Sequence, residues 1–428
     1  MSTSLASTTT QPPRERHLSV LDRWARHALY SRMQYLQDGE IVFVDAGNRQ
    51  AFGQRNESLP LSVTITVHDP QFYREVAFGG DVGAGESYMS GRWSCSNLTD
   101  FIRIIVRNRQ VLTRMEKGLA WMVTPARKAV HYLRRNNKTG SRKNIAAHYD
   151  LGNDFFELFL DETLMYSCAI FEREESTLYE ASVTKNDRIC RKLQLSPKDH
   201  LLEIGTGWGG FALHAAQHYG CRVTTTTISK EQHRLAQQRL TAAGLADRVT
   251  VLLEDYRDVK GQYDKLVSIE MIEAVGHQYL DTFFRCCSRL LKPQGMMLLQ
   301  GITIADQYYE QARRSVDFIK KYIFPGSFIP SLTSMSQSLA RATDLRLFHL
   351  EDQGPHYATT LRHWRERMFA NLARLHALGY SDTFVRMWEY YLCYCEGGFQ
   401  ERILGDVQML LVKPLSRRAP IQPSLPHP

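Results

Sequence analysis

Several features that would place this chain in a membrane or outside the cell are missing from its sequence. It has no run of 18 consecutive apolar residues, so no transmembrane helix is expected. Residues 1–17 are rich in Ser, Thr and Pro and lack the apolar segment of a secretory signal peptide. These absences predict a cytoplasmic protein that would meet a membrane, if it does so, from one face only.

The cysteines also lack a recognisable pattern. Eight are scattered over 428 residues, and no two of them form a CxxC pair, which argues against a zinc site. A disulfide framework is not expected in a chain of this length, and a reducing compartment fits best. We therefore expect neither a bound metal nor disulfide bonds.

What is present is the composition of a globular protein with a basic balance. The chain is 43% hydrophobic and 11% aromatic, which is enough for large cores in two or three domains. Its formal net charge is +8. A basic balance indicates an anionic partner, which could be nucleic acid, a phospholipid surface or an acidic substrate.

Both ends of the chain and its first hundred residues differ from the rest. Residues 1–17 and 416–428 have the composition of disordered tails. Residues 18–118 indicate a small mixed α/β domain, because short strand-like and helical patterns follow one another there. The chain is therefore expected to carry a smaller N-terminal domain before its main domain.

Within this small domain, strands are predicted at residues 40–47 and 59–69 from their β-branched content. A helical pattern over residues 97–108 begins at Asn97, a favourable N-cap residue. The glycines of residues 78–93 are expected to mark turns.

Residues 101–145 carry twelve Lys or Arg residues and one acid, Glu116, with apolar residues such as Leu119 and Trp121 between them. One interpretation is a basic amphipathic segment that lies on an anionic bilayer. The alternative is a solvated, positively charged connection between domains, and residues 119–144 are assigned as a basic linker. The sequence leaves both interpretations open.

From residue 145 to 415 the chain alternates between short apolar runs and helical patterns. The runs are DHLLEIGT, CRVTTTTIS, RVTVLLED, YDKLVSIE and GMMLLQGIT. Continuous apolar strands separated by helices predict a mostly parallel, Rossmann-like α/β sheet with helices on both faces. Ligands of such sheets bind outside the carboxyl ends of the strands.

A glycine-rich turn follows the first of these strands, in LLEIGTGWGGF. Gly205, Gly207 and Gly210 satisfy the GxGxxG spacing of dinucleotide-binding proteins, although this spacing alone is weak evidence. An NAD enzyme carries an acid at the end of the second strand, where this chain has Thr, Ile and Ser. Glu203 before the glycines instead looks like motif I of a class I S-adenosylmethionine (SAM) methyltransferase, with Asp255 as the acid expected near adenine.

The chemistry of SAM fits glycines at this turn. SAM has no pyrophosphate, so it requires close approach of the backbone to its methionine part rather than the charge of a helix N-terminus. The alternative is a tight strand-to-helix turn without a ligand.

Flanking motifs carry a resemblance to a known family. They are HYDLGNDFF (148–156), YSC (166–168), SIEMIEAVG (268–276), YIFPGSFIPS (322–331) and YYLCYCEGGF (390–399). With the glycine turn they resemble the cyclopropane-fatty-acid synthases and the related mycolic acid cyclopropane synthases and methyltransferases. PQFYREV (70–76) and GAGESYMSGRW (83–93) look like the smaller N-terminal domain of the bacterial synthase, which implies a lipid-contacting and dimerising role for residues 18–118 and a homodimer.

The resemblance implies a reaction. SAM donates a methyl group to the double bond of an unsaturated acyl chain in a membrane phospholipid, which leaves a carbocation. A base then removes a proton and a cyclopropane ring closes; in this family the base is thought to be a bound bicarbonate ion. The site must exclude water, and aromatic faces can stabilise the passing cation. The protein would work at the inner face of the membrane on anionic lipids.

The resemblance also assigns cofactor residues. Tyr166 and Ser167 would lie against SAM, the glycine turn would contact its methionine part, a second-strand element would surround the ribose, and two residues would lie at the adenine edge. The full set is Tyr166, Ser167, Glu203, Gly205, Gly207, Trp208, Gly209, Thr227, Ile228, Ser229, Gln232, Asp255 and Tyr256.

For the bicarbonate pocket the resemblance implies Cys168, Glu273, Ile302 and Tyr357, with Glu273 orienting the ion and the Tyr357 hydroxyl donating to it. Gln300 stands where the well-known bacterial synthase has a histidine. An amide can donate a hydrogen bond but cannot carry a proton between groups, so the change bears on ring closure. Cys395 matches a cysteine once proposed as catalytic, and small-residue packing is the alternative for it.

Three other functions stay open on the sequence alone. A C-methyltransferase of the same fold could make a methyl-branched or methylene fatty acid without closing a ring. A lipid-binding protein with a vestigial SAM fold is disfavoured by the intact glycine turn and by Glu273 and Tyr357. An RNA methyltransferase could use the basic charge, but the cations cluster with apolar residues rather than as stacking platforms, so nucleic acid is not expected.

Overall fold

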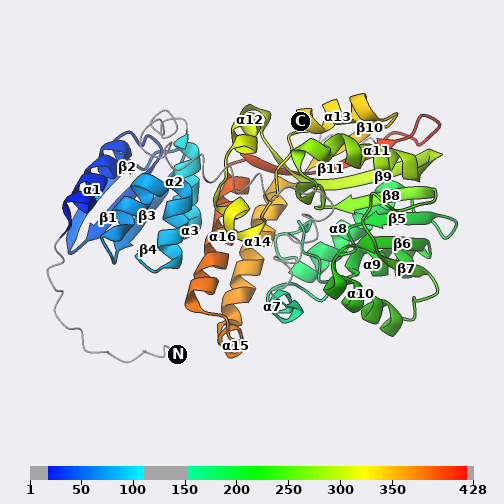
Figure 1. Cartoon of the computed structure of the whole chain (residues 1–428), viewed down its shortest axis with the longest axis horizontal. Helices are drawn as coiled ribbons and strands as arrows, with labels where there is room; N and C mark the ends of the chain where they lie inside the picture. The colour runs from blue at the N-terminus through cyan, green and yellow to red at the C-terminus, as the bar shows by residue number, and fades with distance from the viewer. Residues whose placement is uncertain (1–17, 110–151, 422–428) are drawn as a thin grey trace. The chain divides into compact units, whose positions relative to one another are not determined.

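The computed structural model describes residues 18–109 and 152–421 (Figure 1). The terminal tail 1–17, the linker assigned to residues 119–144 and the first part of HYDLGNDFF lie outside the described residues. The chain divides into two compact units, residues 1–123 with 382–390 and residues 124–381 with 391–428.

The first unit contains a four-stranded sheet in the order β2-β1-β3-β4. β1 pairs with β2 antiparallel and with β3 parallel, so the sheet contains both kinds of pairing. The elements are α1 (Val20–Met33), β1 (Gly39–Asp45), β2 (Asn48–Gln54), β3 (Ser62–Val67), α2 (Gln71–Met89), β4 (Trp93–Cys95) and α3 (Leu98–Arg107). Asn97 caps α3, because its side chain accepts a hydrogen bond from the Asp100 amide, which confirms the predicted N-cap.

The turns expected from the glycines of residues 78–93 are largely wrong. α2 runs through most of this segment and is interrupted by a kink at Gly80, whose φ is +60°. Gly83 lies so close to the preceding turn that a Cβ there would stand 2.0 Å from the Glu75 carbonyl oxygen. The glycines therefore permit close packing across the kink, and only Gly91 lies in a turn beyond the helix.

The second unit is built on a seven-stranded sheet in the order β10-β11-β9-β8-β5-β6-β7 (Figure 1). β5, β6, β7, β8 and β9 pair in parallel, whereas β11 is antiparallel to both β9 and β10. The strands are β5 (His200–Ile204), β6 (Arg222–Thr227), β7 (Val249–Leu253), β8 (Tyr263–Ile269), β9 (Leu291–Ile304), β10 (Arg346–Asp352) and β11 (Leu404–Val412). The predicted mostly parallel sheet is confirmed.

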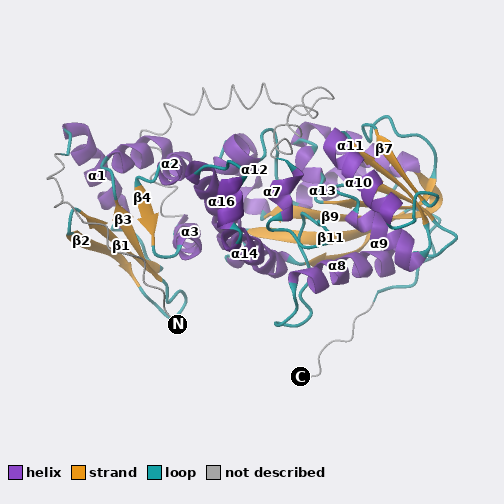
Figure 2. Cartoon of the chain, turned by 90° about the horizontal axis from the view of Figure 1, so that it is seen from below, coloured by secondary structure: helices purple, strands orange, loops and turns teal. Residues whose placement is uncertain are grey.

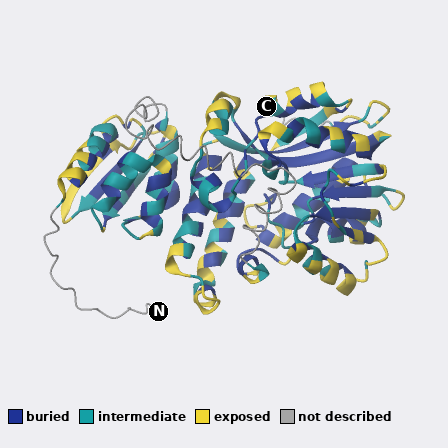
Figure 3. Ribbon diagram, viewed as in Figure 1, coloured by how far each residue is buried: buried dark blue, intermediate teal, exposed yellow. Residues whose placement is uncertain are grey.

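Helices cover both faces of this sheet, as Figure 2 shows. One core packs α8 (Leu178–Leu193), α9 (Gly210–Tyr219) and α10 (Lys230–Ala242) on the strands, and the other packs α11 (Leu280–Leu290) and α13 (Leu332–Ala342). The central strands β5, β6, β8, β9 and β11 are mostly buried, whereas the edge strand β10 is not (Figure 3).

Further helices complete the second unit. They are α7 (Asn153–Glu157), two 3-10 turns (Ile272–Ala274 and His277–Tyr279), α12 (Asp306–Arg314), a π-helical turn (Ile319–Ile323), α14 (Gly354–Ala370), α15 (Leu372–Ala377) and α16 (Asp382–Gln400), whose first half belongs to the first unit. Across the described ranges, none of the helices combines the length and apolar character needed to cross a bilayer.

Candidate active site

The residues predicted from the sequence gather at the carboxyl ends of the parallel strands. The glycine turn follows β5, Thr227 ends β6, Asp255 follows β7 and Glu273 follows β8. Gln300 and Ile302 lie in the last third of β9. This edge of a parallel sheet is where α/β proteins bind their ligands.

The turn between β5 and α9 has the backbone conformation that its glycines predict. Gly207 has a φ of +52°, and a Cβ built on it would meet no other atom within 4 Å. Gly209 has a φ of +83° and lies close to α10, since its Cβ would stand 3.2 Å from Cβ of Ala236. Gly207 therefore presents bare backbone to open space, which fits close approach by a cofactor.

Glu203, near the end of β5, forms hydrogen bonds that stabilise this turn. It is buried, and its carboxylate accepts a 2.6 Å hydrogen bond from the Thr225 hydroxyl, which is also 2.7 Å from the Thr206 hydroxyl. Burial raises the pKa of Glu203 to about 8. The side chain thus ties β5 to β6 beneath the glycines.

The second-strand residues shape the next turn. The Ser229 side chain caps α10 by accepting a hydrogen bond from the backbone N–H of Gln232. Thr227 donates its hydroxyl to the Gln232 side-chain oxygen at 2.8 Å. Ile228, between them, is half-buried. These contacts fix the strand-to-helix turn beside the glycines.

At the end of β7, the predicted adenine-edge residues are partly engaged by the protein. Asp255 is paired with Arg257 through hydrogen bonds of 2.6 and 2.8 Å. The Tyr256 ring packs edge-on against Phe283, with centroids 5.6 Å apart.

An aromatic cluster borders the site. Tyr166 packs against Trp364 at 5.1 Å and Phe156 at 5.3 Å, and Tyr357 stacks on Phe399 at 4.5 Å. Its members are Phe156, Phe159, Tyr166, Trp208, Phe324, Tyr357, Trp364, Tyr391 and Phe399. Their faces provide surfaces beside which a cation can be stabilised.

Two further predicted residues form hydrogen bonds with polar side chains. The Trp208 indole N–H donates to the Asn153 side-chain oxygen at 2.8 Å. The Ser167 hydroxyl accepts a 3.1 Å hydrogen bond from Nζ of Lys185, a fully buried lysine of α8.

Glu270, which the sequence analysis did not select, lies at the centre of the polar residues. Its Oε2 accepts from the Tyr357 hydroxyl at 2.5 Å. Its Oε1 accepts from the backbone N–H of Cys168 at 2.7 Å and from Nε2 of Gln300 at 3.0 Å. Cys168, Gln300 and Tyr357 were all predicted site residues, and the structure brings them together around this carboxylate.

Gln300 is held by a chain of buried polar groups. Its Oε1 accepts from Nε2 of Gln408 at 3.0 Å, and Oε1 of Gln408 accepts from Nζ of Lys192 at 2.7 Å. Lys192 also pairs with Glu351 at 2.7 Å. This series of hydrogen bonds, which we call the amide relay, runs from Glu270 through Gln300 of β9 and Gln408 of β11. It ends at the ion pair between Lys192 and Glu351 of the edge strand β10.

Glu273 and Ile302 pair with each other rather than with Glu270. The Ile302 backbone N–H donates to Oε1 of Glu273 at 2.6 Å. Burial and the neighbouring Glu270 raise the pKa of Glu273 to about 8. Glu273 is therefore mostly protonated at neutral pH.

The other titratable groups define the local charge. Burial, together with Glu270 and Glu273, raises the pKa of Asp406 well above its ordinary range. Burial lowers the pKa of Lys185 to about 8, although Glu270 acts in the opposite direction. Lys185 is therefore a cation at neutral pH. Among Glu270, Glu273 and Asp406, Glu270 accepts the most hydrogen bonds.

The two predicted cysteines are thiols. Burial raises the pKa of Cys168 well above its ordinary value, and its backbone rather than its sulfur contacts Glu270. Burial also raises the pKa of Cys395. No hydrogen bond joins Cys395 to the Glu270 contacts within the described ranges, so its predicted catalytic role stays a prediction.

A bicarbonate ion does not fit the donors that the resemblance assigns to it. The Tyr357 hydroxyl and the Cys168 amide each have one proton, and both already donate to Glu270. Gln300 directs its Nε2 at Glu270 and at the Cys168 carbonyl, 3.3 Å away. A carboxylate of the chain itself occupies these donors.

Sequence reasoning missed Glu270, Lys185, Gln408 and Asp406. Glu270 offered a signal, because an acid directly after a central parallel strand points at the ligand edge. Gln408 offered a weaker one, as a lone amide inside an apolar run. Lys185 offered none, since it is one of several cations in an ordinary helical pattern.

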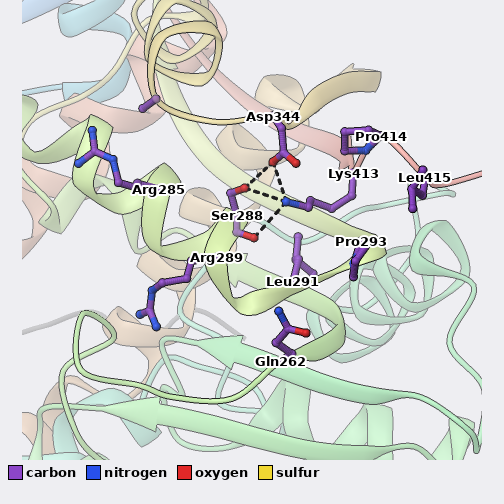
Figure 4. A pocket seen from close by; sticks show the side chains of 11 residues that line it. Gln262, Arg285, Ser288, Arg289, Leu291, Pro293, Asp344, Lys413, Pro414 and Leu415 are labelled. Carbon is purple, nitrogen blue, oxygen red and sulfur yellow. Dashed lines mark hydrogen bonds and ion pairs between the residues drawn. The ribbon is translucent and has the colours of Figure 1, made fainter.

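A surface pocket of about 460 Å³ lies at the opposite edge of the sheet, where β8 and β9 begin. Figure 4 shows Ser288 and Lys413 directed at Asp344, and their hydrogen bonds to it measure 2.6 and 2.7 Å. Ser288, Asp344 and Lys413 form hydrogen bonds with one another far from the glycine turn, so we do not place chemistry there.

Comparison with known proteins supports the fold. The family described as "Mycolic acid cyclopropane synthetase" matches residues 136–409. The "Tuberculostearic acid methyltransferase UfaA1" of Mycobacterium tuberculosis is 38% identical over 364 residues, covering 83% of this chain and 84% of that protein. The "Cyclopropane-fatty-acyl-phospholipid synthase" of Escherichia coli K12 is 38% identical over 348 residues, covering 81% and 86%.

Among solved structures, "mycolic acid cyclopropane synthase CmaA1 complexed with SAH and CTAB" aligns with a TM-score of 0.59 at 34% identity. It covers 64% of this chain and 98% of that chain. SAH is SAM without its methyl group. The expected class I methyltransferase fold and the expected resemblance are both confirmed.

Proposed function

The chain belongs to the mycolic acid cyclopropane synthetase family of SAM-dependent methyltransferases, and from that premise we propose that it methylates the double bond of unsaturated fatty acyl chains in membrane phospholipids. The proposed product is a cyclopropane ring. The observation that carries the proposal is the carboxylate of Glu270, which accepts hydrogen bonds from Tyr357, Cys168 and Gln300 beside an aromatic cluster at the carboxyl edge of the sheet.

The residues present fit the chemistry of this reaction. When bound, SAM supplies an electrophilic methyl group on a positively charged sulfur. The bare backbone at Gly207 would accommodate its methionine part, and Thr227, Ser229 and Asp255 would surround its nucleoside. Tyr166 and Trp364 would present ring faces to the acyl cation, and the buried Trp364 would help to keep water from quenching it.

A second product is supported by one of the comparisons. The Mycobacterium relative named as a methyltransferase matches this chain as well as the Escherichia synthase does. Proton loss without ring closure would give a methylene-branched chain. A saturated methyl branch needs an added hydride, so it would require a second enzyme.

The test is expression in a bacterial host that lacks its own synthase, followed by mass spectrometry of phospholipid acyl chains. A cyclopropane adds one CH2 unit and resists mild hydrogenation, whereas a methylene branch adds the same mass and takes up hydrogen. A Gly209→Val variant, which blocks the glycine turn, is the matched control. Unchanged acyl chains in cells that contain folded protein would refute the proposal.

We further propose that the protein binds anionic membrane surfaces from the cytoplasmic side through its basic segment and acts as a homodimer. The net charge of +8 supports the first part. Neutralising Arg134, Arg135, Lys138, Arg142 and Lys143 should weaken sedimentation with anionic vesicles. The control neutralises five exposed cations of the second unit, Lys198, Arg222, Arg234, Arg248 and Lys260. If both variants lose vesicle binding equally, binding depends on net charge and not on the basic segment. The homodimer is tested separately by sedimentation equilibrium, which should give twice the mass of one chain.

A further inference from the structure

We propose that Glu270 is the catalytic base of this enzyme and replaces the bicarbonate ion that the family resemblance implies. This inference rests on the proposed function, because it assigns the group that takes the proton from the alkylated acyl chain. Four features of the structure support it.

The first feature is the set of donors. The Tyr357 hydroxyl, the Cys168 amide and the Gln300 amide all point at the Glu270 carboxylate, at 2.5, 2.7 and 3.0 Å. These are the groups that would otherwise hold an oxyanion. Three hydrogen bonds donated to one carboxyl group stabilise its ionised form, which is the form a base requires.

The second feature is the direction of the hydrogen bonds. Lys192 can only donate, so Gln408 must turn its oxygen toward it and its NH2 toward Gln300. Gln300 must then turn its own NH2 toward Glu270. Lys192, at the far end of this series of hydrogen bonds, therefore fixes Glu270 as a hydrogen-bond acceptor.

The third feature is the backbone. Glu270 has a φ of +48°, although it is not a glycine, and its N–H donates to the Gln300 carbonyl at 2.9 Å. A left-handed conformation costs about 1–2 kcal/mol for such a residue. Strain of this kind is retained where it places a functional side chain.

The fourth feature is the balance of charge and access. Lys185 supplies a buried cation, and burial together with the neighbouring Glu270 raises the pKa values of Glu273 and Asp406. Burial also raises the pKa of Glu270, which strengthens it as a base. The residue is half-buried rather than sealed, so a reacting group can approach it.

The proposed step is balanced in atoms and charge. The π electrons of the double bond form a C–C bond to the methyl carbon as the C–S bond breaks and its electrons remain on sulfur. A C–H bond of the new methyl group then breaks, its electrons close the ring, and the proton goes to the Glu270 carboxylate. The products are SAH, the cyclopropane and a neutral carboxylic acid at Glu270.

The experiment uses two variants of the purified, full-length enzyme in buffers freed of bicarbonate. Glu270→Gln keeps the volume of the side chain and removes its basicity. Glu270→Gly removes the carboxylate at a position whose positive φ suits glycine, so the backbone is relieved rather than strained. It also leaves the donors of Tyr357, Cys168 and Gln300 facing a space of carboxylate size.

We expect the wild-type rate to be independent of bicarbonate and the rate of both variants to fall about 10²- to 10⁴-fold. Added bicarbonate or formate should restore Glu270→Gly in a saturable manner and leave Glu270→Gln inactive. Gln194→Gly is the matched control, since Gln194 also has a positive φ, of +53°, at the end of α8. Its rate should stay at the wild-type level with and without the anion.

SAM binding by calorimetry checks that each variant retains a folded site. The inference is overturned if the wild-type enzyme needs bicarbonate, if Glu270→Gln keeps a rate within a few-fold of wild type, or if folded Glu270→Gly responds to no anion. A wild-type enzyme that transfers no carbon from SAM to acyl chains would instead refute the proposed function, whatever the anion does.

Discussion

Replacing Gln408 by glutamate exchanges one NH2 group for an oxygen and tests whether the amide relay controls the base. The new carboxylate would still accept from Lys192, which lies 2.7 Å from the present oxygen. Its second oxygen would face Oε1 of Gln300 at about the present 3.0 Å, and two acceptors would meet without a proton between them. While the new carboxylate is ionised, as the adjacent Lys192 favours, Gln300 can relieve this contact only by turning its amide over.

The size of the effect follows from the contacts that the turned amide loses. Nε2 of Gln300 donates to Glu270 at 3.0 Å and to the Cys168 carbonyl at 3.3 Å, and both would then face an oxygen. A hydrogen bond to a charged group contributes about 1.5–3 kcal/mol, which corresponds to a shift of about 1–2 pH units in the titration of the carboxylate. Losing a donor destabilises the ionised form, so the pKa of Glu270 rises.

The assay is the pH dependence of methyl transfer between about pH 6 and 9. Because a protonated Glu270 cannot act as a base, the acid limb of the profile should move upward by about 1–2 units, so that the rate at a given pH on that limb should fall about 10- to 100-fold. Activity should recover at high pH. A merely structural defect would lower the whole profile without moving it.

Gln408→Met is the matched control, because it removes the link without reversing its direction. Gln300 would still be oriented by Glu270 and the Cys168 carbonyl, so the acid limb should stay in place. The unfolding free energy should fall by about 1–3 kcal/mol, since the Gln300 oxygen becomes a buried acceptor without a donor. If the two variants of Gln408 have the same pH profile, the hydrogen bonds from Lys192 through Gln408 and Gln300 do not control the pKa of Glu270, and the prediction is wrong.

Three further predictions concern other parts of the second unit. Tyr357→Phe removes the 2.5 Å donor to Glu270, so the rate should fall about tenfold or more while SAM affinity by calorimetry is unchanged; weaker SAM binding would contradict this. Gly209→Ala should lower both the melting temperature and the SAM affinity more than Gly244→Ala, because both glycines have positive φ but only the first is crowded. Burial alone would raise the pKa of Glu351, but hydrogen bonds from Arg188 and Lys192 lower it to about 2, against 4.5 ordinarily. Ionised Glu351 therefore stabilises the fold above pH 4.5, and this stabilisation is lost as the pH falls toward 2. Glu351→Gln should therefore be less stable than wild type by about 2 kcal/mol at neutral pH and equally stable near pH 2 in urea titrations, and a constant difference would contradict the linkage.

The large features of the fold could be predicted because each depends on local pattern. Apolar runs such as LLEI and VTVLL mark buried parallel strands wherever they occur, and the glycines after β5 require the positive φ values that the structure shows. The glycines of α2 were misread for the same local reason, since glycine favours turns. Only the close approach of Gly83 to the Glu75 carbonyl, which tertiary packing creates, explains why a helix persists there.

The active site could be predicted only as a set of positions. Cys168, Gln300 and Tyr357 were selected through the family resemblance, and the structure brings them together. Their common partner could not be deduced, because Glu270 and Glu273 are three residues apart in one short motif and only one of them matched the family pattern. The 3-10 turn after Met271 separates the two side chains, so that Glu273 meets the Ile302 amide instead.

The departures from ordinary sequence rules coincide at Glu270, and this coincidence is the strongest argument for its role. A left-handed non-glycine residue, a fully buried lysine and two glutamines inside apolar strands each cost stability when taken alone. Gln300 and Gln408 face each other in the register of β9 and β11, and Lys185 lies on the helix layer beside them. Natural sequences violate local rules mainly at functional sites. Apolar residues at the two glutamine positions would serve the core equally well, so the amide relay is explained by what it does for the carboxylate at its end.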